Sequence, residues 1–314
     1  MEKKNIIIDC DPGQDDAIML LLAFSAPEKL NILGITTVAG NVPLNKTQRN
    51  ARIITELANK ESVKIYAGCE KPIQQELVTA ENVHGLEGID GAPIFNPNIP
   101  LQKQHAVDFI IETLNAAEDN SITLVPTGPL TNIAQAIKKD TNILSKISEI
   151  VIMGGAMREG GNTTPSAEFN IYVDPHAADI VFNAGRPIVA MPLDVTHKVI
   201  TDREIINKIE KVGNKSGNLI ASMLKFYNRF DEKKYGSDGG PLHDPCTIAY
   251  LLDKKLFIGK NVNVTVETES NLTLGCTSVD FWGVTKKTKN CFWVHDVNKN
   301  AFFDMLLKQI NKLI

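Results

Sequence analysis

The segment that most constrains the fold of this chain lies close to its start. The isoleucine run at residues 6–8 predicts a buried strand, and the Pro12-Gly13 pair predicts that this strand stops abruptly. Within the next residues there are four aspartates, Asp9, Asp11, Asp15 and Asp16. These carboxylates must therefore crowd the turn at the carboxyl end of a buried strand.

Such crowding of like charges is unfavourable unless something neutralises it. Two like charges about 4 Å apart repel by roughly 4 kcal/mol at an effective dielectric constant near 20, so the carboxylates need a cation, a shared proton or an ordered ligand. Because the ligand atoms would all be oxygens on a loop, a hard cation such as Ca²⁺ or Mg²⁺ fits better than zinc. The alternative is ordinary turn chemistry, with Asp15 or Asp16 stabilised in the first turn of the next helix.

The composition of the chain argues against several classes of protein. Of the 314 residues, 43% are hydrophobic and 22% are charged, and the formal net charge of −4 without a basic stripe argues against a nucleic-acid partner. No apolar stretch approaches the roughly 18 residues that span a bilayer, so no membrane partner is expected. The five cysteines are scattered without a CxxC pair, which predicts reduced thiols in a cytoplasmic protein.

Strand and helix patterns alternate along the first part of the chain. A helix pattern at residues 17–26 is followed by a strand at 33–38, a helix at 44–59 and a strand at 63–66. This alternation predicts an α/β fold with an open, mostly parallel sheet flanked by helices, because right-handed crossovers keep successive strands parallel. We expect a single domain over residues 1–314, with the carboxyl ends of the strands along one edge.

Polar residues follow many of the predicted strands at their carboxyl ends, where open α/β sheets bind ligands. The set comprises Asp11, Asp15, Asp16, Asn41, Thr127, Asn162, Glu168, Asn170, His243 and Asp244. Carboxylates and amides suit vicinal hydroxyl groups, and the chain has no Walker-type lysine loop and no GxGxxG or GxSxG motif. These residues predict recognition of a polyol around a hard cation, where a carboxylate could deprotonate a cation-bound water.

Several of the polar residues also have a purely structural interpretation. His84 lies in an irregular stretch, where a lone histidine is more often a solvated bystander. Asp244 precedes a proline and would make a good helix N-cap, the interpretation we favour for this residue considered alone, and Asp174 is in the same position before another proline. Glu168 and Asn170 alternate with apolar residues, so an extended segment would point both side chains to the same side.

Motifs spread over almost the whole chain match one known family in order. The first is Asp9-Cys10-Asp11-Pro12-Gly13-Gln14-Asp15-Asp16, and the others lie at residues 38–41, 83–85, 127–132, 153–156, 165–170 and 243–244. Together they resemble the signature of the inosine-uridine type nucleoside hydrolases, enzymes that split the N-glycosidic bond of ribonucleosides into ribose and free base. Any one motif would be weak evidence, whereas the ordered set is highly specific.

The resemblance implies a calcium site and a set of sugar contacts. The family's calcium ligands match Asp11, Asp16, Asp244 and the backbone carbonyl of Thr127. Asp11 also matches the general base that activates the calcium-bound water. The residues that match substrate contacts are Asp15 and Asn170 for the 2′- and 3′-hydroxyls, Asn162 and Glu168 for the 5′-hydroxyl, and Asn41, Met153 and Phe169 in the rest of the pocket.

The chemistry of the reaction is consistent with such a pocket. Breaking the C1′–N bond without a protein nucleophile gives an oxocarbenium-like transition state, which carboxylates stabilise more than they stabilise neutral substrate. The departing base needs a proton, and His243 and His84 resemble family histidines near the base, with His243 the better candidate for the general acid. Family members are typically dimers or tetramers, so a homodimer or homotetramer is expected.

Two other functions are compatible with parts of the sequence. An Asp-x-Asp motif after a strand, as at residues 9–11, also occurs in phosphatases of the haloacid dehalogenase type, but Pro12 stands where those enzymes have Thr or Val. The second alternative is a non-catalytic nucleoside-binding protein on the same fold, and the presence of Asp11 argues against it. The base preference stays open. Tyr227 and Tyr235 are candidates for the wall facing the base, although aromatic residues at helical spacing more often belong to the core.

Overall fold

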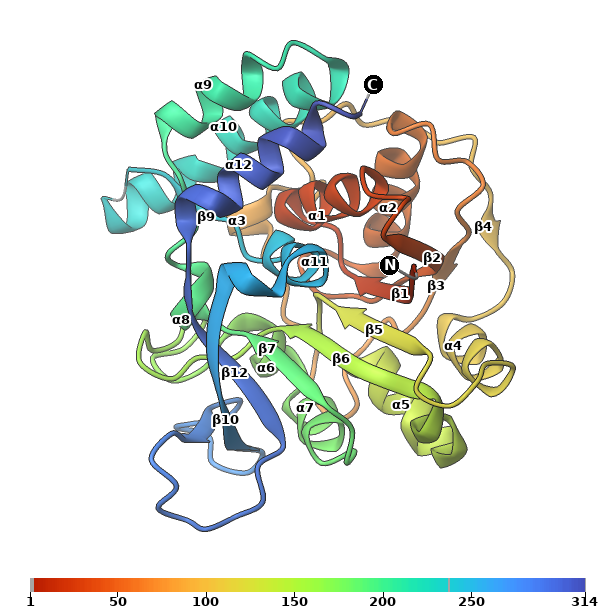
Figure 1. The fold of residues 1–314 in the computed structure, drawn as a ribbon, viewed down its shortest axis with the longest axis vertical. Coiled ribbons are helices and arrows are strands. Elements are labelled where there is room, and N and C mark those ends of the chain that lie inside the picture. The colour runs from red at the N-terminus through yellow and green to blue at the C-terminus, as the bar shows by residue number, and fades with distance from the viewer. Residues whose placement is uncertain (1–2, 237, 314) are drawn as a thin grey trace.

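A ten-stranded sheet runs through the centre of the molecule (Figure 1). The computed structural model describes residues 3–236 and 238–313. The strands of the large sheet are β1 (Lys4–Cys10), β2 (Leu30–Thr37), β3 (Ile65–Ala67), β4 (Leu101–Gln102), β5 (Ile122–Pro126), β6 (Ile147–Met153), β7 (Ile188–Met191), β10 (Phe257–Val266), β11 (Thr277–Asp280) and β12 (Cys291–Val297). A separate antiparallel pair consists of β8 (Ile200–Thr201) and β9 (Gly240–Pro241).

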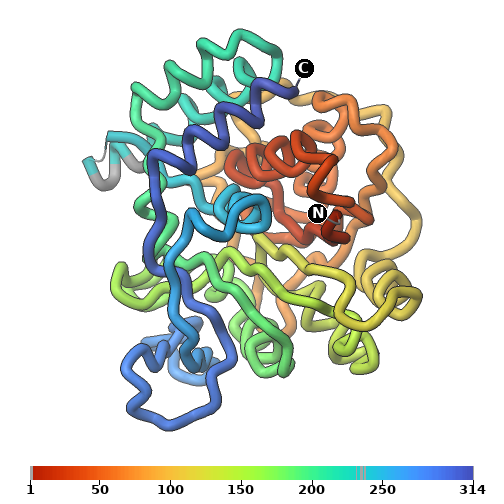
Figure 2. The backbone as a smooth tube through the Cα atoms, viewed as in Figure 1, coloured from red at the N-terminus to blue at the C-terminus, as the bar shows by residue number. Residues whose placement is uncertain are grey.

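The large sheet is open and mostly parallel. Its strand order is β11-β10-β12-β7-β6-β5-β1-β2-β3-β4, and the eight neighbouring strands from β12 to β4 run parallel. Strand β10 runs antiparallel to both of its neighbours, β11 and β12. The backbone tube shows the β10–β12 region, in blue, extending away from the rest of the molecule (Figure 2).

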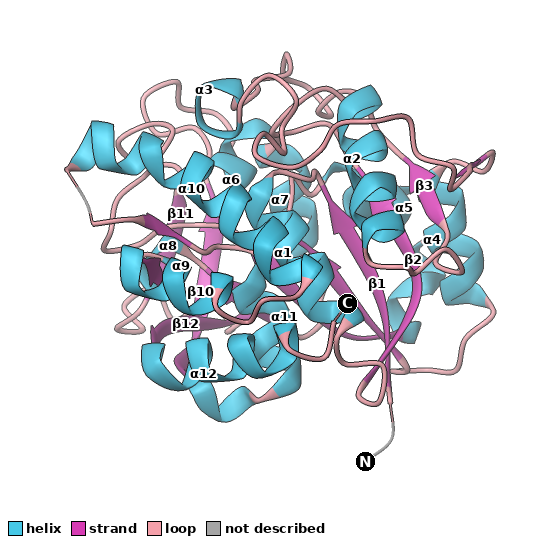
Figure 3. Ribbon diagram, turned by 90° about the horizontal axis from the view of Figure 1, so that it is seen from above, coloured by secondary structure: helices cyan, strands magenta, loops and turns pink. Residues whose placement is uncertain are grey.

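Helices cover both faces of the sheet (Figure 3). They are α1 (Gln14–Phe24), α2 (Leu44–Leu57), α3 (Glu81–His84), α4 (Ala106–Asn115), α5 (Thr131–Lys139), α6 (Phe169–Val173), α7 (Pro175–Phe182), α8 (Leu193–Thr196), α9 (Arg203–Glu210), α10 (Lys215–Tyr235), α11 (Pro245–Leu252) and α12 (Lys299–Ile310), with 3₁₀ helices at Thr141–Lys146 and Lys254–Leu256. Alternate side chains of β1 pack against the helices on opposite faces of the sheet. Ile6 and Ile8 pack with α1, α11 and α12, whereas Ile7 packs with α4, α5 and α7.

The fold class predicted from the alternating patterns is confirmed, with local differences. The helix predicted from residue 17 begins at Gln14, because Gly13 is its N-cap and the N–H of Gly13 donates to the Asp16 carboxylate. The stretch predicted to be irregular around residue 84 contains the one-turn helix α3, which ends at His84. The segment from Glu168 to Val173 is not extended. Glu168 is instead the N-cap of α6.

The order of the strands creates a crevice beside β1. Strands β2, β3 and β4 add to one side of β1, whereas β5, β6 and β7 add to the other side. Such a reversal leaves a gap at the carboxyl ends of the two central strands, where ligands bind in open α/β sheets. Asp11 directly follows β1 and Thr127 directly follows β5, and the N–H of Thr127 donates to the carbonyl of Asp9 over 2.8 Å. The polar turns therefore meet at this crevice.

Candidate active site and cation site

Asp11 is fully buried at the bottom of the crevice. The N–H of Asn41 donates to Oδ2 of Asp11 over 2.7 Å. Two glycines make room for the carboxylate, since a Cβ on Gly40 would lie 2.0 Å from Oδ2 and a Cβ on Gly128 would lie 2.5 Å from Oδ1. Oδ1 is buried and has no hydrogen-bond partner among the described residues. The surroundings thus fix Asp11 while leaving one of its oxygens for a ligand.

The first turn of α1 contributes two more carboxylates. Asp16 accepts hydrogen bonds from the N–H of Gly13 over 3.0 Å and from the hydroxyl of Thr127 over 2.8 Å. Asp15 and Asp16 therefore sit at a helix N-terminus, as the structural interpretation predicted, and also beside Asp11, as the functional interpretation predicted. The two interpretations describe the same position.

Asp244 completes a compact group of carboxylates. One oxygen from each of Asp15, Asp16 and Asp244 lies within 4.8 Å of the other two, and all three residues are buried. Oδ1 of Asp15 is buried without a hydrogen-bond partner among the described residues, as is Oδ1 of Asp11. Buried carboxylate oxygens without donors fit a hard cation. The group includes Asp15, which the sequence resemblance assigns to the sugar and not to the cation.

Burial and mutual repulsion raise the pKa of these carboxyl groups. The pKa of Asp16 is raised from 3.8 to about 7, first by burial and then by the charge of Asp15. The pKa of Asp11 is raised well above its usual value by burial and by Asp16, and that of Asp244 by burial and by Asp15. The crowding predicted from the sequence is therefore an electrostatic cost that a bound cation would relieve.

Glu168 and Asn170 are oriented by the start of α6. Oε1 of Glu168 accepts from the N–H of Asn170 over 2.9 Å, and Oε2 accepts from the N–H of Gly155 over 3.0 Å. The amide of Asn170 donates to the carbonyls of Thr127, over 2.8 Å, and of Met153, over 3.1 Å. The prediction of an extended segment was wrong because a side-chain cap begins a five-residue helix that is too short to show a helical period.

A cavity of about 340 Å³ lies above the carboxylates and has the size of a small-molecule site. Eleven of the residues proposed from the sequence line it, namely Asp15, Asn41, His84, Thr127, Met153, Asn162, Glu168, Phe169, Asn170, His243 and Asp244. Asp11 and Asp16 are fully buried and do not line it. Residues from distant parts of the chain therefore converge on one cavity, as their positions after strand ends predicted.

Two histidines face this cavity from different elements. Nδ1 of His243 lies 2.8 Å from the hydroxyl of Thr196, at the end of α8, and the pKa of His243 is lowered well below its usual value by burial and by the nearby histidines. The ring of His84 lies 5.5 Å from that of Tyr227, between centroids. His84 is buried, with 7% of its surface exposed, so the bystander interpretation was wrong.

Two further predictions about aspartates are resolved by their contacts. Asp174 caps α7 by accepting from the N–H of Ala177 over 3.0 Å, as predicted. Asp244 precedes α11 but its carboxylate caps no N–H of that helix, so the capping prediction was wrong for this residue. Asp9 is fully buried, and its Oδ1 accepts hydrogen bonds from the hydroxyl of Thr36 and the amide of Asn132.

Some residues of the cavity wall were not predicted from the sequence. His197 lines the cavity just after α8, and its ring lies 5.7 Å from that of His243. Its position beyond the end of β7 was the available signal. Tyr227, a doubtful candidate from the sequence, lines the cavity together with Phe230 from α10, whereas the side chain of Tyr235 is outside what the structure describes.

Two further features concern the cysteines and the lengths of the helices. All five cysteines are free thiols. Among the described residues, no helix is both long enough and apolar enough to cross a membrane.

Comparisons with known proteins find a matching family, similar sequences and similar solved structures. The family described as inosine-uridine preferring nucleoside hydrolase matches residues 6–304. The chain is 45% identical over 306 residues to a pyrimidine-specific ribonucleoside hydrolase RihA of Photobacterium profundum, covering 97% of this chain and 98% of that protein. RihA of Escherichia coli is 42% identical over 97% of each chain. Among solved structures, a purine-preferring ribonucleoside hydrolase from Gardnerella vaginalis superposes with a TM-score of 0.91 at 32% identity, covering 98% of both chains.

Proposed function

The chain belongs to the inosine-uridine preferring nucleoside hydrolase family, and from this premise we propose that it hydrolyses ribonucleosides to ribose and free base with Asp11 as the general base. The observation that carries the proposal is the buried Asp11 carboxylate, which keeps one oxygen without a donor beside three clustered carboxylates, two of which, Asp15 and Asp244, line a ligand-sized cavity. Pyrimidine ribonucleosides are the proposed preferred substrates, supported by the 42–45% identity to RihA proteins.

The proposed cation is Ca²⁺, held by Asp11, Asp16, Asp244 and the carbonyl of Thr127. When bound, such an ion lowers the pKa of a coordinated water and so makes it a better nucleophile. The structure supports this set in part, because Asp16 and Asp244 belong to the compact carboxylate group and Asp11 has an unpartnered oxygen next to it. Asp15 joins the same group, so we propose that its second oxygen contacts the sugar.

The proposed sugar site uses the residues that orient one another around α6. Asn170 with Asp15 would hold the 2′- and 3′-hydroxyls, and Glu168 with Asn162 would hold the 5′-hydroxyl. Burial raises the pKa of Glu168 to about 7 even though three backbone N–H groups donate to it. A carboxyl group in this state can accept from or donate to a hydroxyl. The carboxylates around the ribose would stabilise positive charge on the ring as the C1′–N bond breaks.

The departing base is proposed to receive its proton from His243, whose lowered pKa makes the protonated ring a minor species near pH 7 but a strong acid when it forms. This histidine lines the cavity and is oriented through Nδ1 by Thr196, which leaves Nε2 for the base. General acid catalysis of this kind typically contributes about 10² to 10⁴ in rate.

The variant Asp11→Asn tests the assignment of the base. We expect it to fold, to bind ribose, and to lose about 10²- to 10⁴-fold in kcat for ribose release, because the amide cannot take a proton from water. Asp202→Asn is the matched control, since Asp202 caps α9 and does not line the cavity. Full activity of Asp11→Asn would contradict the proposal.

Assembly and location are proposed from the sequence. A homodimer or homotetramer is proposed from the family resemblance, and light scattering of the purified protein measures it. The cytoplasmic location expected from the cysteine pattern stays a prediction.

A further inference from the structure

Gln14 is a fully buried residue at the start of α1, directly before Asp15 in the chain, and each polar atom of its amide has a hydrogen-bond partner. Nε2 of Gln14 donates to the carbonyl of His84 over 2.8 Å and to the carbonyl of Asp90 over 3.1 Å. Oε1 of Gln14 lies 2.8 Å from Nδ1 of His84. One buried side chain therefore holds both the backbone and the ring of the same histidine.

These contacts determine which nitrogen of His84 carries the proton. The carbonyls of His84 and Asp90 can only accept hydrogen bonds, so the amide NH₂ of Gln14 must face them. The amide oxygen must then face the ring, and because this oxygen can only accept, Nδ1 of His84 must donate. Burial lowers the pKa of His84, which favours a neutral ring with a single proton. Nε2 is then an acceptor.

The backbone at Gly13 restricts the position of the imidazole ring of His84. A Cβ on Gly13 would lie 2.4 Å from Nδ1 of His84 and 2.6 Å from Cε1, so this edge of the ring lies close against the backbone of the acidic turn. Among the described residues, none forms a hydrogen bond with Nε2, and His84 lines the cavity. The nitrogen without a protein partner is thus the one available to a bound molecule.

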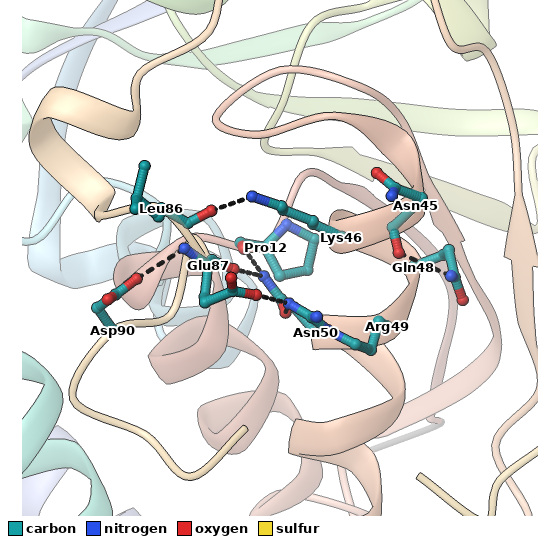
Figure 4. Close-up of polar contacts among 9 residues, drawn as sticks. All are labelled: Pro12, Asn45, Lys46, Gln48, Arg49, Asn50, Leu86, Glu87 and Asp90. Carbon is teal, nitrogen blue, oxygen red and sulfur yellow. Dashed lines mark hydrogen bonds and ion pairs between the residues drawn. The ribbon is translucent and has the colours of Figure 1, made fainter. Parts of the chain in front are cut away.

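A second amide ties the next residues to the same turn. Asn50 in α2 donates to the carbonyl of Pro12 over 3.1 Å and to the carbonyl of Glu87 over 2.7 Å, and Arg49 pairs with the carboxylate of Glu87 at 2.5 Å (Figure 4). The N–H of Glu87 donates to the Asp90 carboxylate over 2.9 Å. This anchor fixes the backbone after His84 without touching its ring, so it provides a natural control for the effect of Gln14.

We propose that Gln14 is a positioning residue that holds His84 as the tautomer with its proton on Nδ1, so that Nε2 of His84 accepts a hydrogen bond from the bound nucleoside. The inference rests on the proposed function for the identity of the bound molecule. The tautomer itself depends only on the contacts of Gln14. His84 and His243 then have different tasks, because His84 offers an acceptor while His243 supplies a proton.

Nitrogen NMR of the histidine side chains tests the tautomer in the intact protein without any assay of activity. With His84 assigned by comparison with His84→Ala, we expect a protonated Nδ1 and an unprotonated Nε2 at pH 7.5. A proton on Nε2 would overturn the proposal. Addition of ribose or, separately, of uracil should shift the Nε2 resonance in at least one case, and a resonance that moves with neither would contradict the acceptor role.

Two variants separate positioning of the ring from anchoring of the backbone. Gln14→Met removes the partner of Nδ1, whereas Asn50→Leu removes the second anchor and leaves that partner in place. We expect Gln14→Met to lose the single Nδ1–H tautomer and Asn50→Leu to keep it. The same tautomer change in both variants, or in neither, would reduce Gln14 to a structural role and refute the proposal.

Kinetics then tests whether Gln14 acts through His84. We expect Gln14→Met to lower kcat/KM for uridine by at least about tenfold, the loss of one oriented hydrogen bond. On a His84→Ala background the same substitution should change kcat/KM less than about twofold. Equal losses on both backgrounds would contradict the proposal. If no nucleoside is hydrolysed at all, the proposed function fails, while the NMR result still decides the tautomer.

Discussion

The buried carboxyl groups make a quantitative prediction about how stability depends on pH. In the metal-free protein the pKa of Asp16 rises from 3.8 to about 7, and this shift of about three units corresponds to roughly 4 kcal/mol. Between pH 4 and pH 7 the folded state keeps a proton on Asp16 that the unfolded state has released. The free energy of unfolding must therefore fall as pH rises through this range, by up to about 1.4 kcal/mol per pH unit for this group.

A cation reverses this dependence. Because the proposed Ca²⁺ would bind the ionised carboxylates, its stabilising effect should be small at pH 5 and large at pH 7.5. Urea unfolding at several pH values, once with a chelator and once with Ca²⁺, measures both trends. With the chelator present, the free energy of unfolding of Asp16→Asn should fall less steeply with pH, by up to about 1.4 kcal/mol per pH unit. The reason is that asparagine binds no proton in either the folded or the unfolded state. Equal slopes for Asp16→Asn and the unaltered protein would refute the reasoning.

Three other predictions concern the groups that support the site. Gly40→Ala should lower kcat about 100-fold or more in a folded protein, because a Cβ there would lie 2.0 Å from Oδ2 of Asp11; unchanged kcat would show that the carboxylate can move without loss. Thr196→Val removes the hydroxyl 2.8 Å from Nδ1 of His243 and should lower kcat about tenfold with little change in KM, and its pH–rate profile checks that His243 is affected. Asn132→Leu removes a donor to the buried Asp9 carboxylate and should reduce the free energy of unfolding by about 1–3 kcal/mol in urea, whereas an unchanged midpoint would contradict the importance of this contact.

The features that could be predicted from the sequence are those that depend on local pattern. The isoleucine run and the Pro-Gly turn determine where β1 ends, so Asp11 could be placed correctly beyond a strand. Parallel strands bring all their carboxyl ends to one edge, so Thr127 and Asn170 could be grouped with Asp11 from the sequence. The family motifs then connected this group with a reaction.

The features that could not be predicted depend on contacts between distant segments. The hydrogen bond from the N–H of Gly13 to Asp16 stabilises an earlier start of α1, and the cap made by Glu168 begins a helix too short to leave a pattern. Tyr227 and Phe230 bring one side of α10 to the cavity, and no periodicity shows which face of a helix meets a cavity instead of the core. The contacts of Gln14 with His84 join residues 70 positions apart, and nothing in the local sequence indicates them.

Hydrolysis of nucleosides by the purified protein tests the central claim most directly. Free ribose would be measured with uridine, cytidine, inosine and adenosine, each with and without a strong calcium chelator. We expect ribose release that is fastest with the two pyrimidine nucleosides and that is abolished by the chelator and restored by Ca²⁺. Absence of ribose release from all four nucleosides in the presence of Ca²⁺ would contradict the proposed reaction, and release that is insensitive to the chelator would contradict the cation site.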